Sequence, residues 1–95
     1  MTEEKVLEIL KAISHPSRVE ILAAVRAKQD ASGATCNSVL NCLNISQSTF
    51  SHHISELIQT GLVVGKSQGK FMMLSIDENV WEEFHQKLGQ AIFKK

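Results

Sequence analysis

The stretch that decides the fold reads NISQSTFSHHISELIQTGL and runs from Asn44 to Leu62. Ser46 can act as a helix N-cap, because its hydroxyl can accept a hydrogen bond from an unpaired amide one turn into the helix. Gly61 can adopt the left-handed conformation that commonly ends a helix. The sequence therefore predicts one helix with a marked start and a marked end.

This predicted helix has two different faces. One stripe at three- and four-residue spacing is typical of packing along a core, and it contains Phe50, His53, Ile54, Leu57 and Ile58. The other face carries Gln47, Ser48, Ser51, His52 and Ser55. None of the residues on the second face is acidic, so it can lie against a nucleic-acid groove without charge repulsion. Taken alone, such a face is more often simply solvated.

A second, shorter helix is predicted just before this one. Thr35 can cap a short helix whose apolar residues are spaced as a single buried stripe, namely Cys36, Val39, Leu40 and Leu43. Asn44 and Ile45 then turn the chain. Two helices joined by such a short turn, with polar side chains on the second, have the layout of a helix-turn-helix DNA reader.

After Gly61 the hydrophobic pattern changes to that of strands. Residues 62–64 and 71–76 are short runs of strand-forming side chains, separated by the six residues 65–70. The natural interpretation is a β-hairpin with Lys66 and Lys70 at its tip. Lysines there can contact phosphates and position a reading helix, although lysines are also common in ordinary solubilising turns.

Two helices are predicted at the start of the chain. Thr2 can cap the first, which has a buried stripe of Val6, Ile9, Leu10 and Ile13. Pro16 suits the first position of the second, because the amide that proline lacks is unpaired there anyway. We expect this second helix to weaken by Lys28 and to bury Val19, Ile21, Leu22 and Val25, with a loop over residues 29–34.

Arg18 lies in the first turn of this second helix and has two interpretations. Its guanidinium could reach a DNA phosphate. An ion pair with a nearby carboxylate, such as Glu20, Glu56 or one of the N-terminal acids, is the interpretation that we favour.

The last predicted helix has the properties of a dimerisation element. Three residues offer caps for it, namely Asp77, Glu78 and Asn79, and Asn79 and Glu82 have the spacing of a capping box. A stripe of large apolar side chains follows, with Trp81, Phe84, Leu88 and Ile92. We expect this stripe, with Leu7 of the first helix, to pack against a second copy, since aromatic residues contribute much of the buried area at interfaces. The alternative is packing against the chain's own core.

The bulk composition describes one small domain over residues 1–95. With 95 residues and 43% apolar content, the stability of the monomer should be marginal unless a partner adds buried surface. Ten basic and ten acidic residues cancel, so no overall field attracts DNA, which counts against nucleic-acid binding. Two cysteines and the lack of a signal-like or membrane-spanning run favour a soluble cytoplasmic protein with no membrane partner.

The order of predicted elements resembles a winged-helix repressor, and three stretches resemble the ArsR/SmtB family of bacterial transcriptional repressors. They are ISHPSRVEIL at residues 13–22, SQSTFSHHI at residues 46–54, and GLV at residues 61–63 together with Gly69-Lys70. The resemblance covers nearly the whole chain. It implies a mostly α winged helix-turn-helix with a small β-hairpin, ordered α-α-α-α-β-β-α.

The resemblance also implies partners and site residues. It implies a homodimer that binds a palindromic double-stranded DNA operator, with the first and last helices at the dimer interface and an effector, of unknown identity, that releases the DNA. Carried over by position, the residues expected to face the major groove are Gln47, Ser48, Thr49, Ser51 and His52. Those expected in the wing are Lys66, Gln68 and Lys70. We interpret His53, on the apolar flank, as a partly buried structural residue.

Departures from the family pattern bear on metal sensing. Metal-sensing members often have paired cysteines at the start of the third helix, where this chain has one cysteine, Cys36, one place away from those positions. Others have histidines and carboxylates along the last helix, where this chain offers His85 without a second histidine one turn later. Leu74 also stands where the family usually has tyrosine. We therefore predict no metal site and no cofactor, and nothing positive indicates an enzyme.

The two cysteines, Cys36 and Cys42, have a redox interpretation and a structural one. Six residues along a helix rise by roughly 9 Å, so the two thiols could not form a disulfide within one helix. A thiolate of Cys36 stabilised at a helix N-terminus would give a redox- or thiol-responsive repressor. Two small buried hydrophobic side chains are the interpretation that we favour.

A rival function is a winged-helix protein-interaction module that no longer binds DNA. It is supported by the absence of Lys and Arg from residues 46–60, by the zero net charge, and by Phe71 and Met73 on the expected outer hairpin face. The sequence does not identify an operator or an effector.

Overall fold

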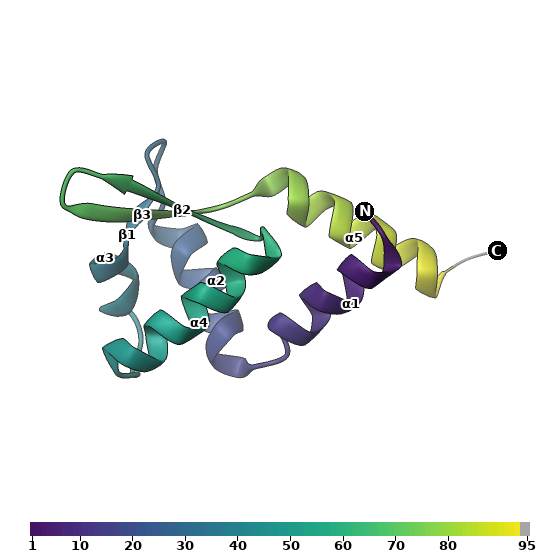
Figure 1. Cartoon of the computed structure of the whole chain (residues 1–95), viewed down its shortest axis with the longest axis horizontal. Helices are drawn as coiled ribbons and strands as arrows, with labels where there is room; N and C mark the ends of the chain where they lie inside the picture. The colour runs from purple at the N-terminus through teal and green to yellow at the C-terminus, as the bar shows by residue number, and fades with distance from the viewer. Residues whose placement is uncertain (94–95) are drawn as a thin grey trace.

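The terminal helices lie at one end of the molecule and a β-hairpin reaches out at the other (Figure 1). The computed structural model describes residues 1–93, which span 48 × 26 × 19 Å. In chain order the elements are α1 (Glu3–Ala12), α2 (Pro16–Lys28), β1 (Ala34–Thr35), α3 (Cys36–Leu40), α4 (Gln47–Thr60), β2 (Val63–Gln68), β3 (Phe71–Ile76) and α5 (Glu78–Ile92). The prediction of a mostly helical winged helix-turn-helix is confirmed, with one strand more than expected.

Most of the predicted helix boundaries are confirmed by the capping geometry. The hydroxyls of Thr2, Thr35 and Ser46 each accept a hydrogen bond from an amide three residues later. Gly61 ends α4 at φ +86°, in the left-handed region that favours glycine. Of the three caps predicted for α5, Asp77 is confirmed, because its carboxylate accepts from the amides of Asn79 and Val80, and the capping box that starts at Asn79 is wrong.

The sheet has a third strand that the sequence did not predict. Its order is β1-β3-β2, antiparallel throughout, with Ala34 opposite Leu74. A strand of two residues is too short to show an alternating pattern, so it was assigned to a loop. β2 also extends to Gln68, and only Gly69 and Lys70 form the turn, so Lys66 lies within a strand and not at the tip.

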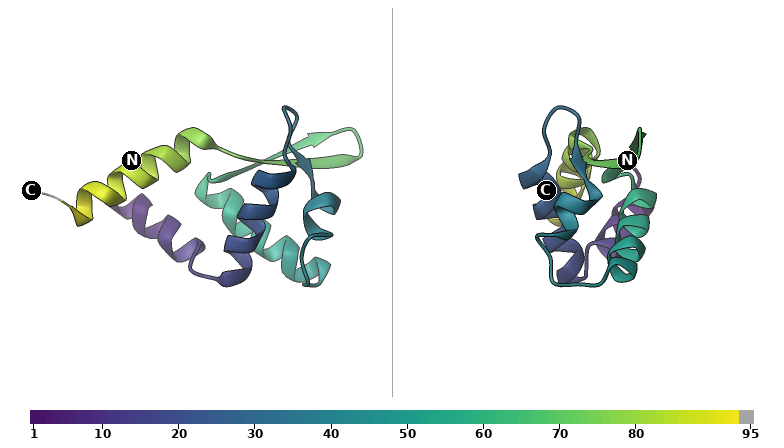
Figure 2. Two further views of the ribbon diagram at one scale, coloured as in Figure 1. Left: turned by 180° about the vertical axis from the view of Figure 1, so that it is seen from behind. Right: turned by 90° about the vertical axis from the view of Figure 1, so that its left-hand side faces the viewer.

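Two clusters form the core. The larger lies between α2, α3, α4 and the sheet and includes Ile21, Val25, Phe50, Leu57 and Leu74. The smaller joins α1, α5 and the start of the hairpin through Val6, Ile9, Leu62 and Phe84. Figure 2 shows α1 and α5 together at one end of the fold, where the smaller cluster packs them against each other and against the start of the hairpin.

One predicted core position on α2 is wrong. Val19 is 53% exposed, whereas Ala24 is buried. Ile21 and Val25 face the core as expected. The spacing of apolar residues on α2 allowed more than one stripe, and contacts with α3, α4 and the sheet selected the stripe that is buried.

Within residues 1–93, none of the helices has the length and apolar character needed to cross a lipid bilayer.

Candidate nucleic-acid interface

The outer face of α4 is a continuous polar surface. The five residues predicted to face a major groove are all exposed, namely Gln47, Ser48, Thr49, Ser51 and His52. Phe50, Ile54 and Leu57 on the opposite face are buried and hold the helix against the core. The predicted division of this helix into two faces is therefore confirmed.

Some of the hydroxyl groups on α4 are occupied locally. The Ser46 hydroxyl donates to Thr49 Oγ1 at 2.9 Å and lies 3.3 Å from the Ser48 hydroxyl. Within residues 1–93, the side chains of Gln47, Ser51 and His52 make no hydrogen bond, so all of their donors and acceptors are available to an external partner. The first turn of α4 also carries no acidic residue.

The wing contributes the cationic groups. Lys66 and Gln68 lie on the outer face of β2, opposite Met73 and Phe71 respectively, and Lys70 follows in the turn. All three of these polar side chains are exposed, and within residues 1–93 neither lysine forms an ion pair. The hairpin tip and the N-terminal end of α4 project from the same end of the molecule, away from α1 and α5 (Figure 1).

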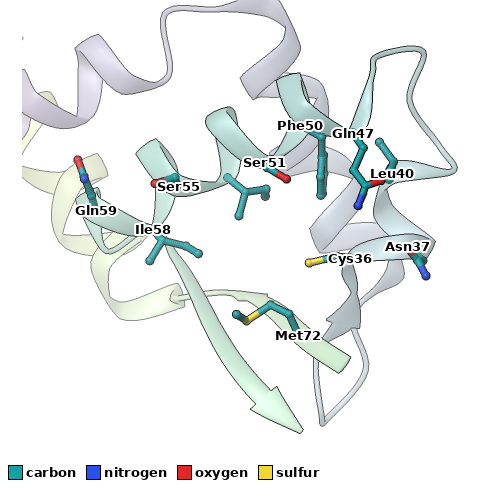
Figure 3. Close-up of a pocket in the computed structure, with 11 residues that line it drawn as sticks. Cys36, Asn37, Leu40, Gln47, Phe50, Ser51, Ser55, Ile58, Gln59 and Met72 are labelled. Atoms are coloured by element: carbon teal, nitrogen blue, oxygen red, sulfur yellow. The ribbon is translucent and has the colours of Figure 1, made fainter. Parts of the chain in front are cut away.

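A groove runs beside α4. It has a volume of about 470 Å³ between α3, α4 and β3 (Figure 3), and the residues that line it include Cys36, Leu40, Ser51, Ser55, Ile58 and Met72. Ser51 is therefore shared between the exposed face of α4 and this groove. Ser55 and Gln59 extend the polar rim along the helix beyond the residues that the sequence analysis selected for the interface.

The two cysteines lie in different environments. Cys36 is half-buried at the start of α3, and burial raises the pKa of its thiol. Cys42 lies beyond the end of α3 and is exposed, with its Sγ 3.3 Å from the Ser38 carbonyl oxygen. The prediction that both are buried hydrophobic side chains is therefore wrong for Cys42. Both thiols are free.

Arg18 occupies neither of the places predicted for it. Its side chain is only 6% exposed and cannot reach out to a phosphate. Its Nε donates to His53 Nδ1 at 2.9 Å, and one terminal nitrogen donates to the Ala12 carbonyl oxygen at 2.9 Å. The predicted ion pair with a carboxylate is therefore also wrong. The spacing of Arg18 with Ile21 and Val25, which share the buried stripe of α2, was the signal that could have indicated its burial.

The stripe on α5 divides between core and surface. Trp81 and Ile92 are 40% and 64% exposed, Leu88 is partly buried, and Leu7 on α1 is 58% exposed. Phe84 is only 3% exposed, because it packs against Val6, Ile9 and Leu62 of its own chain. The assignment of Phe84 to a dimer interface is therefore corrected, since almost none of its side chain is available to a second subunit.

Residues 1–93 contain no group of three or more His, Cys, Asp or Glu side chains placed to hold a metal ion. The site is instead a polar helix face beside a hairpin that carries two lysines.

A short helix, a capped helix with an outward polar face and an adjacent basic hairpin define a winged helix-turn-helix regulator. A family model described as a helix-turn-helix domain matches residues 13–65. The arsenical resistance operon repressor of Staphylococcus xylosus is 30% identical over 89 residues, which cover 93% of this chain and 81% of that protein. The chain belongs to the ArsR family of DNA-binding transcriptional regulators.

Solved structures share the fold across nearly the whole chain. An ArsR-like transcriptional regulator from Rhodococcus sp. RHA1 superposes with a TM-score of 0.80 at 18% identity, covering 93% of this chain and 79% of that chain. The homodimeric winged helix-turn-helix DNA-binding domain from Mycobacterium bovis superposes with a TM-score of 0.71 at 20% identity, covering 96% and 82%.

Proposed function

We propose that this protein is a dimeric repressor that binds a palindromic operator through two copies of α4 and two wings. The observation that carries the proposal is the outward polar face of α4, on which Gln47, Ser51 and His52 have no side-chain hydrogen-bond partner within residues 1–93. Amide and hydroxyl groups are among those that hydrogen-bond to base edges in a major groove. The relative from Staphylococcus xylosus is itself a repressor, which supports the direction of regulation.

The roles within the interface follow from the side chains. Gln47, Ser51 and His52 would contact base edges, and Ser48 and Thr49, whose hydroxyls contact the N-cap, would contribute the surface near the backbone. Residues 46–60 carry no Lys or Arg. The attraction to phosphates would therefore come from Lys66 and Lys70, with Gln68 between them on the wing.

The dimer would form through the helices at the opposite end of the molecule. Leu7, Trp81 and Ile92 are exposed apolar side chains there, and Leu88 is partly exposed. A monomer of this size buries only a modest core, so a second copy would add stability as well as a second reading helix. The neighbour from Mycobacterium bovis is homodimeric, which supports this arrangement.

A single substitution tests the reading face. Ser51→Glu should abolish binding to the DNA upstream of the gene, because a carboxylate would face the groove, while the dimer stays folded. The matched control is Ala27→Glu, which adds the same charge at an exposed position on α2. Gel-shift titrations at low and moderate salt measure both. An unchanged affinity in Ser51→Glu would remove α4 as the reading face.

The same assay tests the rival function. A protein-interaction module without DNA binding would give no shift at either salt concentration, even for the unmodified protein. The outer face of the wing sheet, where Phe71 is 56% exposed, would then be the surface to test for a protein partner.

A further inference from the structure

Arg18 joins three helices through two hydrogen bonds. It belongs to α2, its Nε donates to His53 Nδ1 on α4 at 2.9 Å, and one of its terminal nitrogens donates to the Ala12 carbonyl oxygen at 2.9 Å. Ala12 is the last residue of α1. The guanidinium therefore lies where α1 ends and connects that end to the helix that carries the polar reading face.

The connection to α4 has no counterpart among the described residues. Within residues 1–93, no other side-chain hydrogen bond and no ion pair links α4 to another helix. Apolar packing through Phe50, Ile54 and Leu57 also holds α4 against its neighbours. Apolar packing has little directional preference, whereas a hydrogen bond with a fixed donor and acceptor specifies an orientation.

This hydrogen bond requires one chemical form of His53. A guanidinium has only donors, so His53 Nδ1 must accept with its lone pair. His53 must therefore be neutral, with its proton on Nε2. A protonated imidazole would place an N–H group against the N–H group of Arg18 and a second positive charge beside the guanidinium, so the bond could not persist.

We propose that Arg18 is a positioning residue, which orients α4 for DNA through neutral His53, and that protonation of His53 releases the helix and weakens operator binding. The proposal rests on the proposed function, in which α4 is the reading helix. It adds a connection from the DNA surface to α1, which carries Leu7 of the proposed dimer surface, and a dependence on pH that the reading face alone would not have.

The surroundings of His53 favour its neutral form near neutral pH. Burial lowers the pKa of His53 below its ordinary value of 6.5, and the charges of Arg18, His15 and His52 lower it further. The His15 and His52 rings lie 6.0 and 5.9 Å from the His53 ring. Arg18 and His15 also line a neighbouring cavity of about 330 Å³, to which α1 and α4 contribute the charged residues Glu8, Lys11 and Glu56.

The first test uses the unmodified protein and does not depend on DNA. Nitrogen-15 NMR of the imidazole rings distinguishes the two neutral tautomers and follows the protonation of each histidine. We expect His53 to have an unprotonated Nδ1 near neutral pH and to have a pKa below the ordinary histidine value of 6.5. In Arg18→Met the preference for this tautomer should disappear. An Nδ1–H tautomer for His53, or a pKa of His53 at or above 6.5, would overturn the proposal.

The second test measures DNA affinity at about pH 7.5 and about pH 5.5, on either side of an ordinary histidine pKa. The unmodified protein is compared with His53→Gln, and both keep His52, so the reading face is the same in the two. Between the higher and the lower pH, the affinity of the protein with His53 should fall by about fivefold to tenfold more than the affinity of His53→Gln. Glutamine is neutral at both pH values, and its amide oxygen can still accept a hydrogen bond from Arg18. Equal pH dependence in the two proteins would contradict the proposal.

The two tests separate this inference from the proposed function. If the protein binds no DNA at either pH, the proposed function fails, and the tautomer of His53 still decides whether Arg18 holds α4 through a neutral imidazole. If Arg18→Met does not fold, His53→Gln still tests the proposal. It removes the titrating group and leaves the buried guanidinium with an acceptor.

Discussion

Trp81 and Phe84 lie on neighbouring turns of α5 with their ring centroids 5.6 Å apart and their planes tilted by 48°. They nevertheless face different environments, since Trp81 is 40% exposed and Phe84 is 3% exposed. This aromatic pair thus connects the smaller core cluster, which holds α5 to α1, with the apolar surface that we propose as the dimer interface.

The two aromatic residues should differ in mutational effect. Phe84→Ala should lower the free energy of unfolding by about 3–5 kcal/mol, because it removes a fully buried ring and leaves a cavity. Trp81→Ala should instead weaken association. Urea titrations followed by circular dichroism, repeated over a range of protein concentrations, separate the two effects. A concentration-independent loss of stability in Trp81→Ala would place that ring in the monomer core.

The dimer surface should be sensitive to charge at its exposed apolar positions. Leu7→Glu and Ile92→Glu should each shift the protein from dimer to monomer, because a carboxylate would have to be buried between the subunits. Val64→Glu, at a residue 41% exposed on the wing, is the control and should leave the dimer intact. Sedimentation velocity measures the oligomeric state. A dimer that survives both substitutions would require another interface.

The wing lysines should act on all DNA sequences alike. Lys66→Ala and Lys70→Ala should each weaken binding to operator and non-operator DNA by a similar factor and reduce the slope of log affinity against log salt concentration by about 1. Lys87→Ala, on α5, serves as the control. A loss confined to the operator would assign base recognition to the wing.

The loop before β1 should depend on a single glycine. Gly33 has φ +104°, and a Cβ atom there would lie 2.8 Å from the Leu74 carbonyl oxygen. Gly33→Ala should therefore cost about 1–3 kcal/mol of stability. Gly89→Ala is a matched control, since its Cβ would meet nothing within 4 Å and alanine favours the helix by roughly 0.5–1 kcal/mol. Thermal unfolding of the two variants should shift in opposite directions.

His53 should make stability depend on pH. Its pKa is lowered in the folded state, chiefly by burial, so the unfolded chain takes up a proton first as the pH falls below 6.5. The free energy of unfolding should consequently decrease as the pH falls through the window between 6.5 and the lowered pKa of the folded state. His53→Gln should show a shallower decrease in denaturant titrations across this range. Parallel curves for the two proteins would mean that the pKa of His53 is the same in both states.

Much of the fold could be predicted from short-range signals. Three such signals depend only on interactions within a few residues, so they can be predicted without the tertiary structure. They are the cap at Ser46, the left-handed Gly61 and the position of Pro16. The polar face of α4 could be predicted in the same way, because the spacing of the apolar residues shows which side of the helix is polar.

The tertiary structure decided which groups meet across the chain. Neither the hydrogen bond from Arg18 to His53, 35 residues away, nor the pairing of β1 with β3 leaves a local pattern. Likewise, the apolar stripe of α5 predicted that Trp81 and Phe84 would be buried, but only packing against α1 determined that Phe84 enters the monomer core. Local propensity sets where elements begin and which faces are apolar, whereas contacts between distant residues decide which of those faces are covered.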